Sequence, residues 1–579
     1  MKMTVSHWLQ RGIPWIWLNA GAVAISIIMV IGLLLLLAVR GMGHFWPSDV
    51  MQATYSPPTA PSYSPPTTPS SASPAAASSL SNSAQSTEVI GELVERELIS
   101  SLQIASSGIP VDESQSFYER QLVKLGNRDL TGADFTWVLS AFVSDVSYPE
   151  DVVTLERREW GNFYGFLTEV RENGVAVASG TNEVWEAFNT RLHQALVIHE
   201  QIYRIEKHDI GRINHQTERL RLDERRLELD GRLDDAARQN LETQRQTLNM
   251  EYENLQASLL VLREQINRDS ALFQVAGGQQ TEIRLAQVVR AYKANSMGLG
   301  RKLLTYFSKL GEFLTDEPRE ANTEGGIFPA IFGTVMMVLL MSVFVTPFGV
   351  VAAVYLREYA RQGFITRTIR VAVNNLAGVP SIVYGVFGLG FFIYIIGAEI
   401  DQLFYPEALP APTFGTPGLL WASLTLALLT VPVVIVATEE GLARIPRSVR
   451  EGSLALGATR FETLWRVVLP MASPAMMTGL ILAVARAAGE VAPLMLVGVV
   501  KLAPALPLDG NYPYLHLDQK FMHLGFHIYD VGFQSPNVEA ARPLVFATAM
   551  LLVIVIAALN LSAVALRNRL RDKYKALDV

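Results

Sequence analysis

The sequence predicts an all-α polytopic membrane protein with six transmembrane helices and one inserted domain that contains a helical coiled-coil hairpin. Three observations support this fold class. Six segments are long and apolar enough to cross a bilayer. A polar stretch of nearly 300 residues separates the first segment from the other five, with residue 327 opening the second. Within that stretch, leucines recur at seven-residue intervals, which is typical of a coiled coil.

Composition excludes several classes of function. The chain has 579 residues, 48 Lys and Arg, 55 Asp and Glu, and therefore a net charge of −7. A nucleic-acid binder needs a basic face, so nucleic acid is not an expected partner. The chain has no cysteine, which excludes disulfides, thiol catalysis and cysteine-ligated metals.

Residues 1–46 are expected to form an N-terminal tail and the first membrane helix. The uncharged segment 15–39 would span about 37 Å as a helix, more than the hydrocarbon core needs. We interpret it as an uncleaved anchor, because it is longer than the apolar core of a signal peptide. The alternative is cleavage in the small-residue stretch 72–79. Residues 47–87, rich in Ser, Pro and Thr, are predicted to be a flexible tether.

Residues 88–280 are predicted to be a soluble domain of unassigned secondary structure, with a coiled-coil hairpin at about 190–268. The heptad leucines of its second arm are Leu241, Leu248, Leu255 and Leu262. Asp230-Gly231 provides a break between the two arms. The hairpin is either a projecting rod that docks a partner or a helical pair that closes the domain on itself. Residues 281–326 are expected to be an amphipathic connection.

The remaining segment, residues 327–579, contains the predicted spans 327–355, 376–400, 418–438, 471–499 and 544–566. With six spans, the arginine-rich connections all lie on the side of the N-terminus. The positive-inside rule makes that side cytoplasmic. Both termini are then cytoplasmic, and residues 41–326 are periplasmic.

The cytoplasmic loop 439–470 contains two capping-box patterns, Ser448 with Glu451 and Thr459 with Glu462. Gly457 lies between them. The patterns predict two short helices that meet at a corner that glycine permits and end at Pro470. Capping alone leaves two alternatives open, an ordinary structured loop and a docking element.

The residues of this loop resemble the EAA loop of ABC importer permeases. The matching residues are Glu451-Gly452-Ser453, Gly457 and Val467-Val468-Leu469-Pro470, with Gly452 and Ser453 in place of two alanines. Further segments, including 325–331, 375–385 and 486–490, resemble the PstA-type permeases of phosphate ABC importers. The resemblance covers the first span and the chain from about residue 325. It leaves the large inserted domain unexplained.

This resemblance implies a permease subunit in the bacterial inner membrane that imports inorganic phosphate. The implied partners are a sister permease, two copies of a cytoplasmic ATPase subunit and a periplasmic phosphate-binding protein, beside membrane lipid. The residues expected to couple to the ATPase are Glu451, Gly452, Ser453, Gly457, Thr459, Arg460 and Pro470. The chain has no phosphate-cradling Gly-x-x-x-x-Gly-Lys-Ser/Thr loop. It is therefore not expected to be an enzyme or to hold a cofactor, and ATP and Mg²⁺ belong to the ATPase.

Arg486 and Glu490 are the candidate residues of the substrate path. Charged groups within a span need a partner or a water-filled cavity. On one helix they would lie four residues apart, so they either neutralise each other or place Arg486 where it meets an oxyanion in transit.

Asn375, Pro380 and Gly385 are expected to break or pack the third span. His523 and His527 lack the accompanying Glu of a zinc-hydrolase motif, so no metal site is expected. Two other functions are considered: a permease for another oxyanion or small solute, and a membrane sensor with a periplasmic coiled coil.

Overall fold

The computed structural model describes residues 13–56, 86–106, 109, 115–180, 183–535 and 538–574. The chain divides into two compact units, which are described separately. The membrane unit comprises residues 1–44, 219–238 and 312–579, and the sheet unit comprises residues 45–218 and 239–311. The alternative cleavage stretch 72–79 lies outside the described residues.

Six helices in the described residues are long and apolar enough to cross a membrane, as the sequence predicted. They are α2 (Ile13–Gly43), α9 (Phe328–Val354), α11 with α12 (Ser381–Phe387 and Ala398–Phe404), α13 (Leu419–Arg444), α16 (Leu469–Ala487) and α19 (Val538–Tyr574). Several of them continue through wider π-helical turns. The polytopic helical part of the predicted fold class is therefore confirmed.

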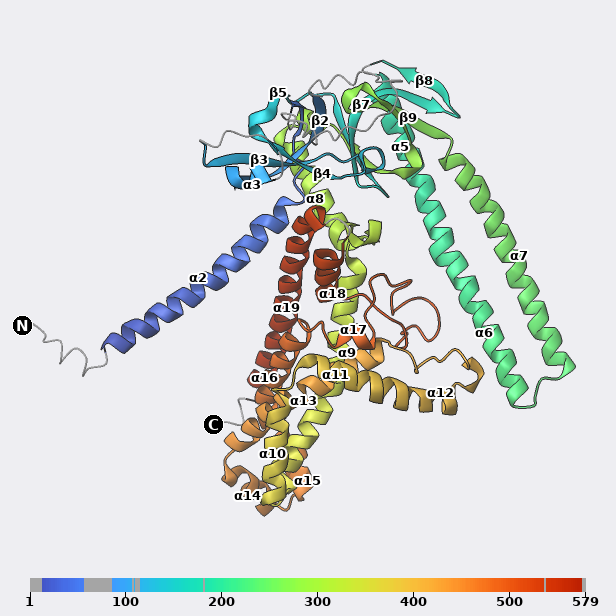
Figure 1. Ribbon diagram of the computed structural model, residues 1–579. Helices are drawn as coiled ribbons and strands as arrows, with labels where there is room; N and C mark the ends of the chain where they lie inside the picture. The colour runs from blue at the N-terminus through green and yellow to red at the C-terminus, as the bar shows by residue number, and fades with distance from the viewer. Residues whose placement is uncertain are drawn as a thin grey trace, which may run out of the picture. The chain divides into compact units, whose positions relative to one another are not determined.

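Helix α13 is the most enclosed of the spans and packs between α9 and α16 (Figure 1). Small residues allow this close approach. A Cβ on Gly349 of α9 would lie 2.6 Å from Val434, and one on Gly479 of α16 would lie 2.7 Å from Ala437. Since lipid supplies little hydrophobic drive between helices, such close van der Waals packing is what holds membrane helices together.

Two predicted span boundaries are wrong. The third span begins only at Ser381, because α10 (Phe364–Leu376) is a separate helix and Pro380 lies in the connection that precedes α11. The fifth helix does not begin after Pro470: it runs from Arg460 through the π-helical turn Leu464–Val468 into α16 and ends at Ala487. Proline normally collides with the carbonyl four residues earlier. We attribute its tolerance here to the wider turn that precedes it.

The sheet unit contains two antiparallel sheets that the sequence analysis did not predict. One has the order β4-β3-β2-β1-β5, and the other β10-β9-β7-β6-β11 with β8 beside β7. The first comprises β1 (Val50–Tyr55), β2 (Thr87–Ser100), β3 (Phe117–Lys124), β4 (Phe135–Leu139) and β5 (Val143–Ser147). The second comprises β6 (Val152–Arg157), β7 (Asn162–Glu172), β8 (Val175–Ser179), β9 (Asp269–Gln274), β10 (Gln280–Arg284) and β11 (Val288–Tyr292).

These strands correct two predicted segments. Strand β1 occupies the start of the predicted tether, whose residues 57–85 lie outside the described part. Strands β10 and β11 occupy the start of the predicted amphipathic connection, which is limited to α8 (Leu299–Thr315). The inserted part is therefore mixed α and β.

The second sheet is organised around the fully buried strand β6. Its last residue, Arg157, is 2% exposed and donates to both carboxylate oxygens of Asp129 at 2.9 and 3.0 Å. The guanidinium also donates to the carbonyls of Trp160 and Gly161. A charge can be buried at this depth only because its donors are satisfied in this way.

Two long helices follow the strands of the sheet unit in the region of the predicted hairpin. Helices α5 (Glu183–Arg204) and α6 (Ile210–Leu229) are continuous through a π-helical turn, and α7 (Asp235–Ile266) returns after Gly231, which has a φ of +66°. Their polar flanks are joined by ion pairs, including Arg263 to Glu206 at 2.7 Å. Long helices with a break at Gly231 are therefore present, while their pairing as a coiled coil and their periplasmic location stay predictions.

His523 and His527 lie in the connection between α16 and α19, where α18 (Leu524–Tyr529) is a short helix. Their side chains are 0% and 2% exposed. Burial lowers the pKa of His523 to about 4. It also lowers that of His527 to about 4, with Asp530 opposing the shift and Lys501 adding to it. Both rings are therefore neutral near pH 7.

We predict that Asp129→Ala destabilises the second sheet by about 3 kcal/mol, because it leaves the buried Arg157 charge without its partner. Hydrogen exchange of β6 in the full chain measures this as faster opening. The exposed pair Arg120 and Glu97, at 2.7 Å, is the matched control. Glu97→Ala should cost at most about 1 kcal/mol, and equal effects of the two variants would contradict the prediction.

We also predict that acid loosens the connection that contains α18. The pKa values of His523 and His527 are lowered in the folded state. The contribution of their neutral rings to the free energy of unfolding is therefore fully present above about pH 6.5 and is lost as the pH falls toward 4. The expected loss at pH 5 is about 2 kcal/mol per ring. Hydrogen exchange of α18 at pH 7 and pH 5 measures it, and His527→Gln should reduce the difference. An unchanged pH dependence in that variant would argue against a contribution from His527.

Candidate functional site

The loop between α13 and α16 forms a rigid corner. Helix α14 (Arg447–Ala455) ends in a Schellman motif, in which the Ala458 amide donates to the Ser453 carbonyl and the Gly457 amide to the Leu454 carbonyl. Gly457 has a φ of +89°, as this motif requires. A Cβ there would meet nothing within 4 Å, so backbone conformation, not space, demands glycine.

The second helix of the corner, α15 (Arg460–Thr463), begins at the predicted capping box. The Glu462 amide donates to the Thr459 hydroxyl at 3.2 Å, and the Thr459 amide donates to the Glu462 carboxylate at 2.9 Å. A 2.9 Å hydrogen bond between the hydroxyls of Ser453 and Thr463 joins the two helices. Ser453 is thus part of the corner.

The other predicted capping box is wrong. Helix α14 starts at Arg447 with Pro446 as its N-cap, which places Ser448 inside the first turn and without a side-chain capping bond. A proline that has no amide hydrogen and a pre-set φ can itself open a helix. The Ser448 pattern therefore predicted a helix start close to the observed one, but Pro446 and not Ser448 is the N-cap.

Arg450 attaches the corner to the membrane helices. Its guanidinium donates to the carbonyls of Leu442 and Ile445 at the end of α13, at 2.9 and 2.8 Å. It also pairs with Glu358, in the turn after α9, at 2.8 Å. Arg450 thus connects α14 to the end of α13 and to the turn after α9. From the sequence, Arg450 is only one of the basic residues of the arginine-rich connections that indicate topology.

The corner also exposes apolar side chains that the sequence analysis did not single out. Leu456 is 91% exposed, and Phe461 and Trp465 are each 64% exposed. The two aromatic rings stack with an interplanar angle of 10°. An apolar surface on a rigid polar loop is typical of a protein interaction site. In the sequence, the signals that could have identified this surface are an apolar residue just before Gly457 and two aromatic residues four positions apart.

Arg486 and Glu490 are brought together, but not within one helix. Arg486 lies in the last turn of α16, whereas Glu490 follows the helix end, and the Arg486 Nε and Glu490 Oε1 atoms are 3.6 Å apart. Their side chains are 31% and 23% exposed. The location within one helix is therefore wrong, while the ion pair is present. A cation in the last turn also interacts favourably with the helix dipole.

Asn375, Pro380 and Gly385 are the residues predicted to break or pack the third span, and Gly385 lies near this ion pair. A Cβ on Gly385 of α11 would lie 2.7 Å from the Cα of Pro493, three residues beyond Glu490. The Tyr384 hydroxyl donates to the Leu376 carbonyl at 2.6 Å, which joins α11 to the end of α10 near Asn375. Gly385 thus has a packing role.

The predicted residues form two separate groups. The helix that begins at Arg460 carries the corner at one end and Arg486 at the other, about 39 Å apart at 1.5 Å per residue. Among the described residues, no group of three His, Cys, Asp or Glu side chains is placed to hold a metal ion.

Comparison with known proteins identifies the membrane unit. Residues 345–573 match the family of binding-protein-dependent transport system inner membrane components. The phosphate transport system permease protein PstA 1 of Mycobacterium tuberculosis is 35% identical over 42% of this chain and 71% of its own length. The probable ABC transporter permease protein YqgH of Bacillus subtilis is 30% identical over 44% and 81%. The probable PstA of Methanocaldococcus jannaschii is 31% identical over 44% and 79%.

Among solved structures, a chain of the MetNI methionine ABC transporter is 20% identical, with a TM-score of 0.31 over 42% of this chain and 94% of its own length. This likeness is too low to add to the assignment, which rests on the family match and the sequence relatives. The chain belongs to the family of binding-protein-dependent transport system inner membrane components, and its membrane unit is a permease of the PstA type.

Proposed function

We propose that this chain and a sister permease form the path by which an ABC importer moves inorganic phosphate into the cytoplasm. The observation that carries the proposal is the rigid corner around Gly457, which combines a fixed bend, exposed apolar side chains and the Arg450 connection to α13 and α9. This is the form that a docking element for a motor subunit needs. Phosphate is the substrate class in the names of the PstA relatives.

The ATPase would bind at Leu456, Phe461 and Trp465. Because Arg450 joins α14 to the carbonyl end of α13, a push on the corner would move the most enclosed helix of the unit. ATP and Mg²⁺ would be held by that ATPase subunit, present in two copies, and this chain would carry out no chemistry itself.

The proposal includes an orientation of the chain in the membrane. The positive-inside rule places the arginine-rich corner, together with both termini, in the cytoplasm of the bacterial cell. The sheet unit would then be periplasmic, on the side from which a phosphate-binding protein delivers its ligand. We propose an auxiliary role for the sheet unit there, since the family match begins only at residue 345.

We predict that Gly457→Val abolishes phosphate uptake while the protein still reaches the membrane. A β-branched residue at a φ of +89° is strained, by about 1–2 kcal/mol or more, and would open the corner. Uptake of labelled phosphate at equal membrane abundance measures the effect.

The matched control is Gly457→Asn, because asparagine tolerates the left-handed conformation. It should retain most of the uptake. Full activity of Gly457→Val would show that the bend is not needed. Uptake of a different solute by the same complex, and none of phosphate, would show that the substrate is another oxyanion or small molecule.

Arg486 tests the substrate path. Arg486→Ala should stop uptake, and Arg486→Lys should reduce it at least tenfold if the planar fork of donors is what the oxyanion meets. If Arg486 only neutralises Glu490, the double variant Arg486→Ala, Glu490→Ala should restore what the single variant loses. Restored uptake would therefore remove Arg486 from the path.

A further inference from the structure

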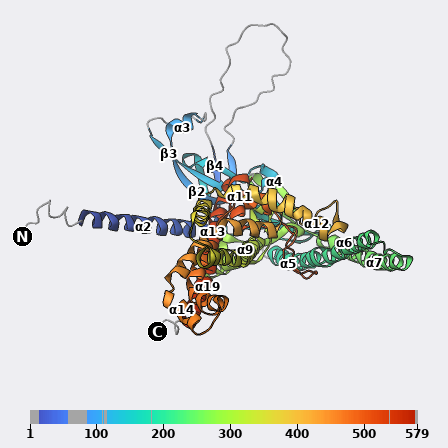
Figure 2. The same cartoon turned by 90° about the horizontal axis from the view of Figure 1, so that it is seen from below.

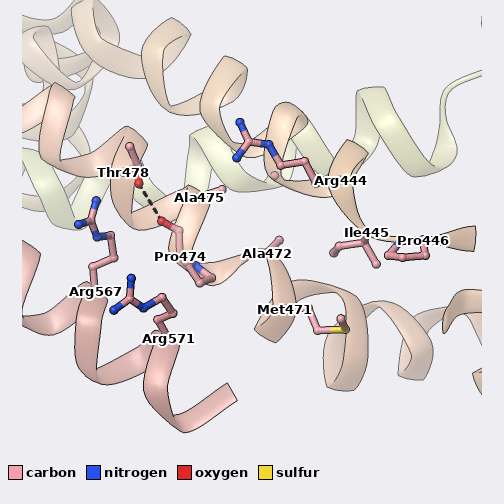
Figure 3. A pocket seen from close by; sticks show the side chains of 11 residues that line it. Arg444, Ile445, Pro446, Met471, Ala472, Pro474, Ala475, Thr478, Arg567 and Arg571 are labelled. Atoms are coloured by element: carbon pink, nitrogen blue, oxygen red, sulfur yellow. Dashed lines mark hydrogen bonds between the residues drawn. The ribbon is translucent and has the colours of Figure 1, made fainter. Parts of the chain in front are cut away.

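A cationic cavity lies where three helices of the membrane unit meet, at the end of α13, the start of α16 and the end of α19. Its volume is about 440 Å³. Three arginines line it, Arg444 from α13 and Arg567 and Arg571 from α19 (Figure 3). Among the described residues that line the cavity, none has an acidic side chain.

The arginine charges are not neutralised by strong ion pairs in the described residues. Arg571 has one weak pair, its Nε lying 3.7 Å from Asp572 at an exposed position. Arg567 and Arg571 are four residues apart on α19, and Figure 3 shows their guanidinium groups on the same face of that helix. Like charges at this spacing repel each other. A bound anion would remove this repulsion, and planar multi-donor guanidinium groups suit phosphate oxygens.

Most of the other residues that line the cavity are apolar. Ile445 and Ala472 are buried, Met471, Pro474 and Ala475 also line it, and Thr478 adds a hydroxyl group. The cavity thus combines three cationic side chains with a mainly apolar wall. It lies at the ends of two membrane spans, α13 and α19, which is the depth of lipid head groups.

We propose that this cavity binds a phosphate group at the membrane surface. The phosphate group of an anionic phospholipid is the favoured ligand, because the apolar wall would contact its acyl chains along α16. Free inorganic phosphate is the other source of the same chemistry. Basic pockets between spans recognise anionic head groups in this manner. The cavity adjoins the start of α14 through Ile445 and Pro446, but neither Gly457 nor Arg486 lines it, and its ligand does not depend on which solute is transported.

The test uses the full chain, in the complex in which it purifies, reconstituted in phosphatidylcholine with or without phosphatidylglycerol. Native mass spectrometry counts the phosphatidylglycerol molecules retained. In a second arm, inorganic phosphate is added to phosphatidylcholine samples and thermal unfolding is followed. The test variant is Arg444→Gln with Arg567→Gln. The matched control is Arg447→Gln with Arg569→Gln, which removes the same charge from α14 and α19 outside the cavity.

Wild type and control should retain phosphatidylglycerol, and the test variant should bind it about 30-fold more weakly, from the loss of two basic contacts. Stabilisation by inorganic phosphate alone, lost only in the test variant, would also support the site and identify a free anion as its ligand. Equal weakening in test and control variants would show diffuse surface attraction and overturn the proposal. The absence of any effect of either probe on the wild type would overturn it as well.

Discussion

The close packing of α13 against α9 and α16 is the constraint on which the rest of the membrane unit depends. Lipid tails are as apolar as leucine, so helices in a bilayer gain little from hiding apolar side chains and must gain from close contact. Gly349 and Gly479 supply that contact by leaving no side chain between backbones. The centre of the unit is therefore closely packed, and protein interiors packed in this way have low compressibility.

The corner around Gly457 is attached to the end of α13. Its bend is held by a Schellman motif, a capping box and a hydroxyl pair, and its orientation by Arg450 (Figure 2 shows α14 and α19 in a second view). Each of these interactions satisfies backbone or side-chain groups that would otherwise compete for other partners. The conformation of the corner is therefore well defined, while Leu456, Phe461 and Trp465 stay exposed.

The sheet unit is stabilised differently, by a buried core like that of a water-soluble domain. Strand β6 is buried along its whole length, and its charged residues are accommodated by partners: Arg157 by Asp129, and Glu156 by Lys309 of α8 at 2.6 Å. Lys309 also donates to the Tyr292 hydroxyl. Such buried polar contacts specify how a helix seats on a sheet, because leaving any member unpaired is costly.

The sequence by itself determined the six spans, the family and the Gly457 corner. Each is encoded locally: a span by one apolar segment, a capping box by residues three apart, and a left-handed corner by a glycine. The helices of the hairpin could be predicted for the same reason, since leucines seven apart lie on one face.

Only the tertiary structure decided the two sheets, the arginine cavity and the role of Arg450. Strand β9 pairs with β7 although they lie far apart in the sequence: Phe166 of β7 is opposite Gln274 of β9, 108 residues further along the chain, so no local pattern could pair them. Arg444 and Arg567 line one cavity only because α13, α16 and α19 converge there. Glu490 left its expected helix because α16 ends at Ala487, three residues before it. Contacts between distant segments depend on how the helices and strands pack, which spacing along the chain does not encode.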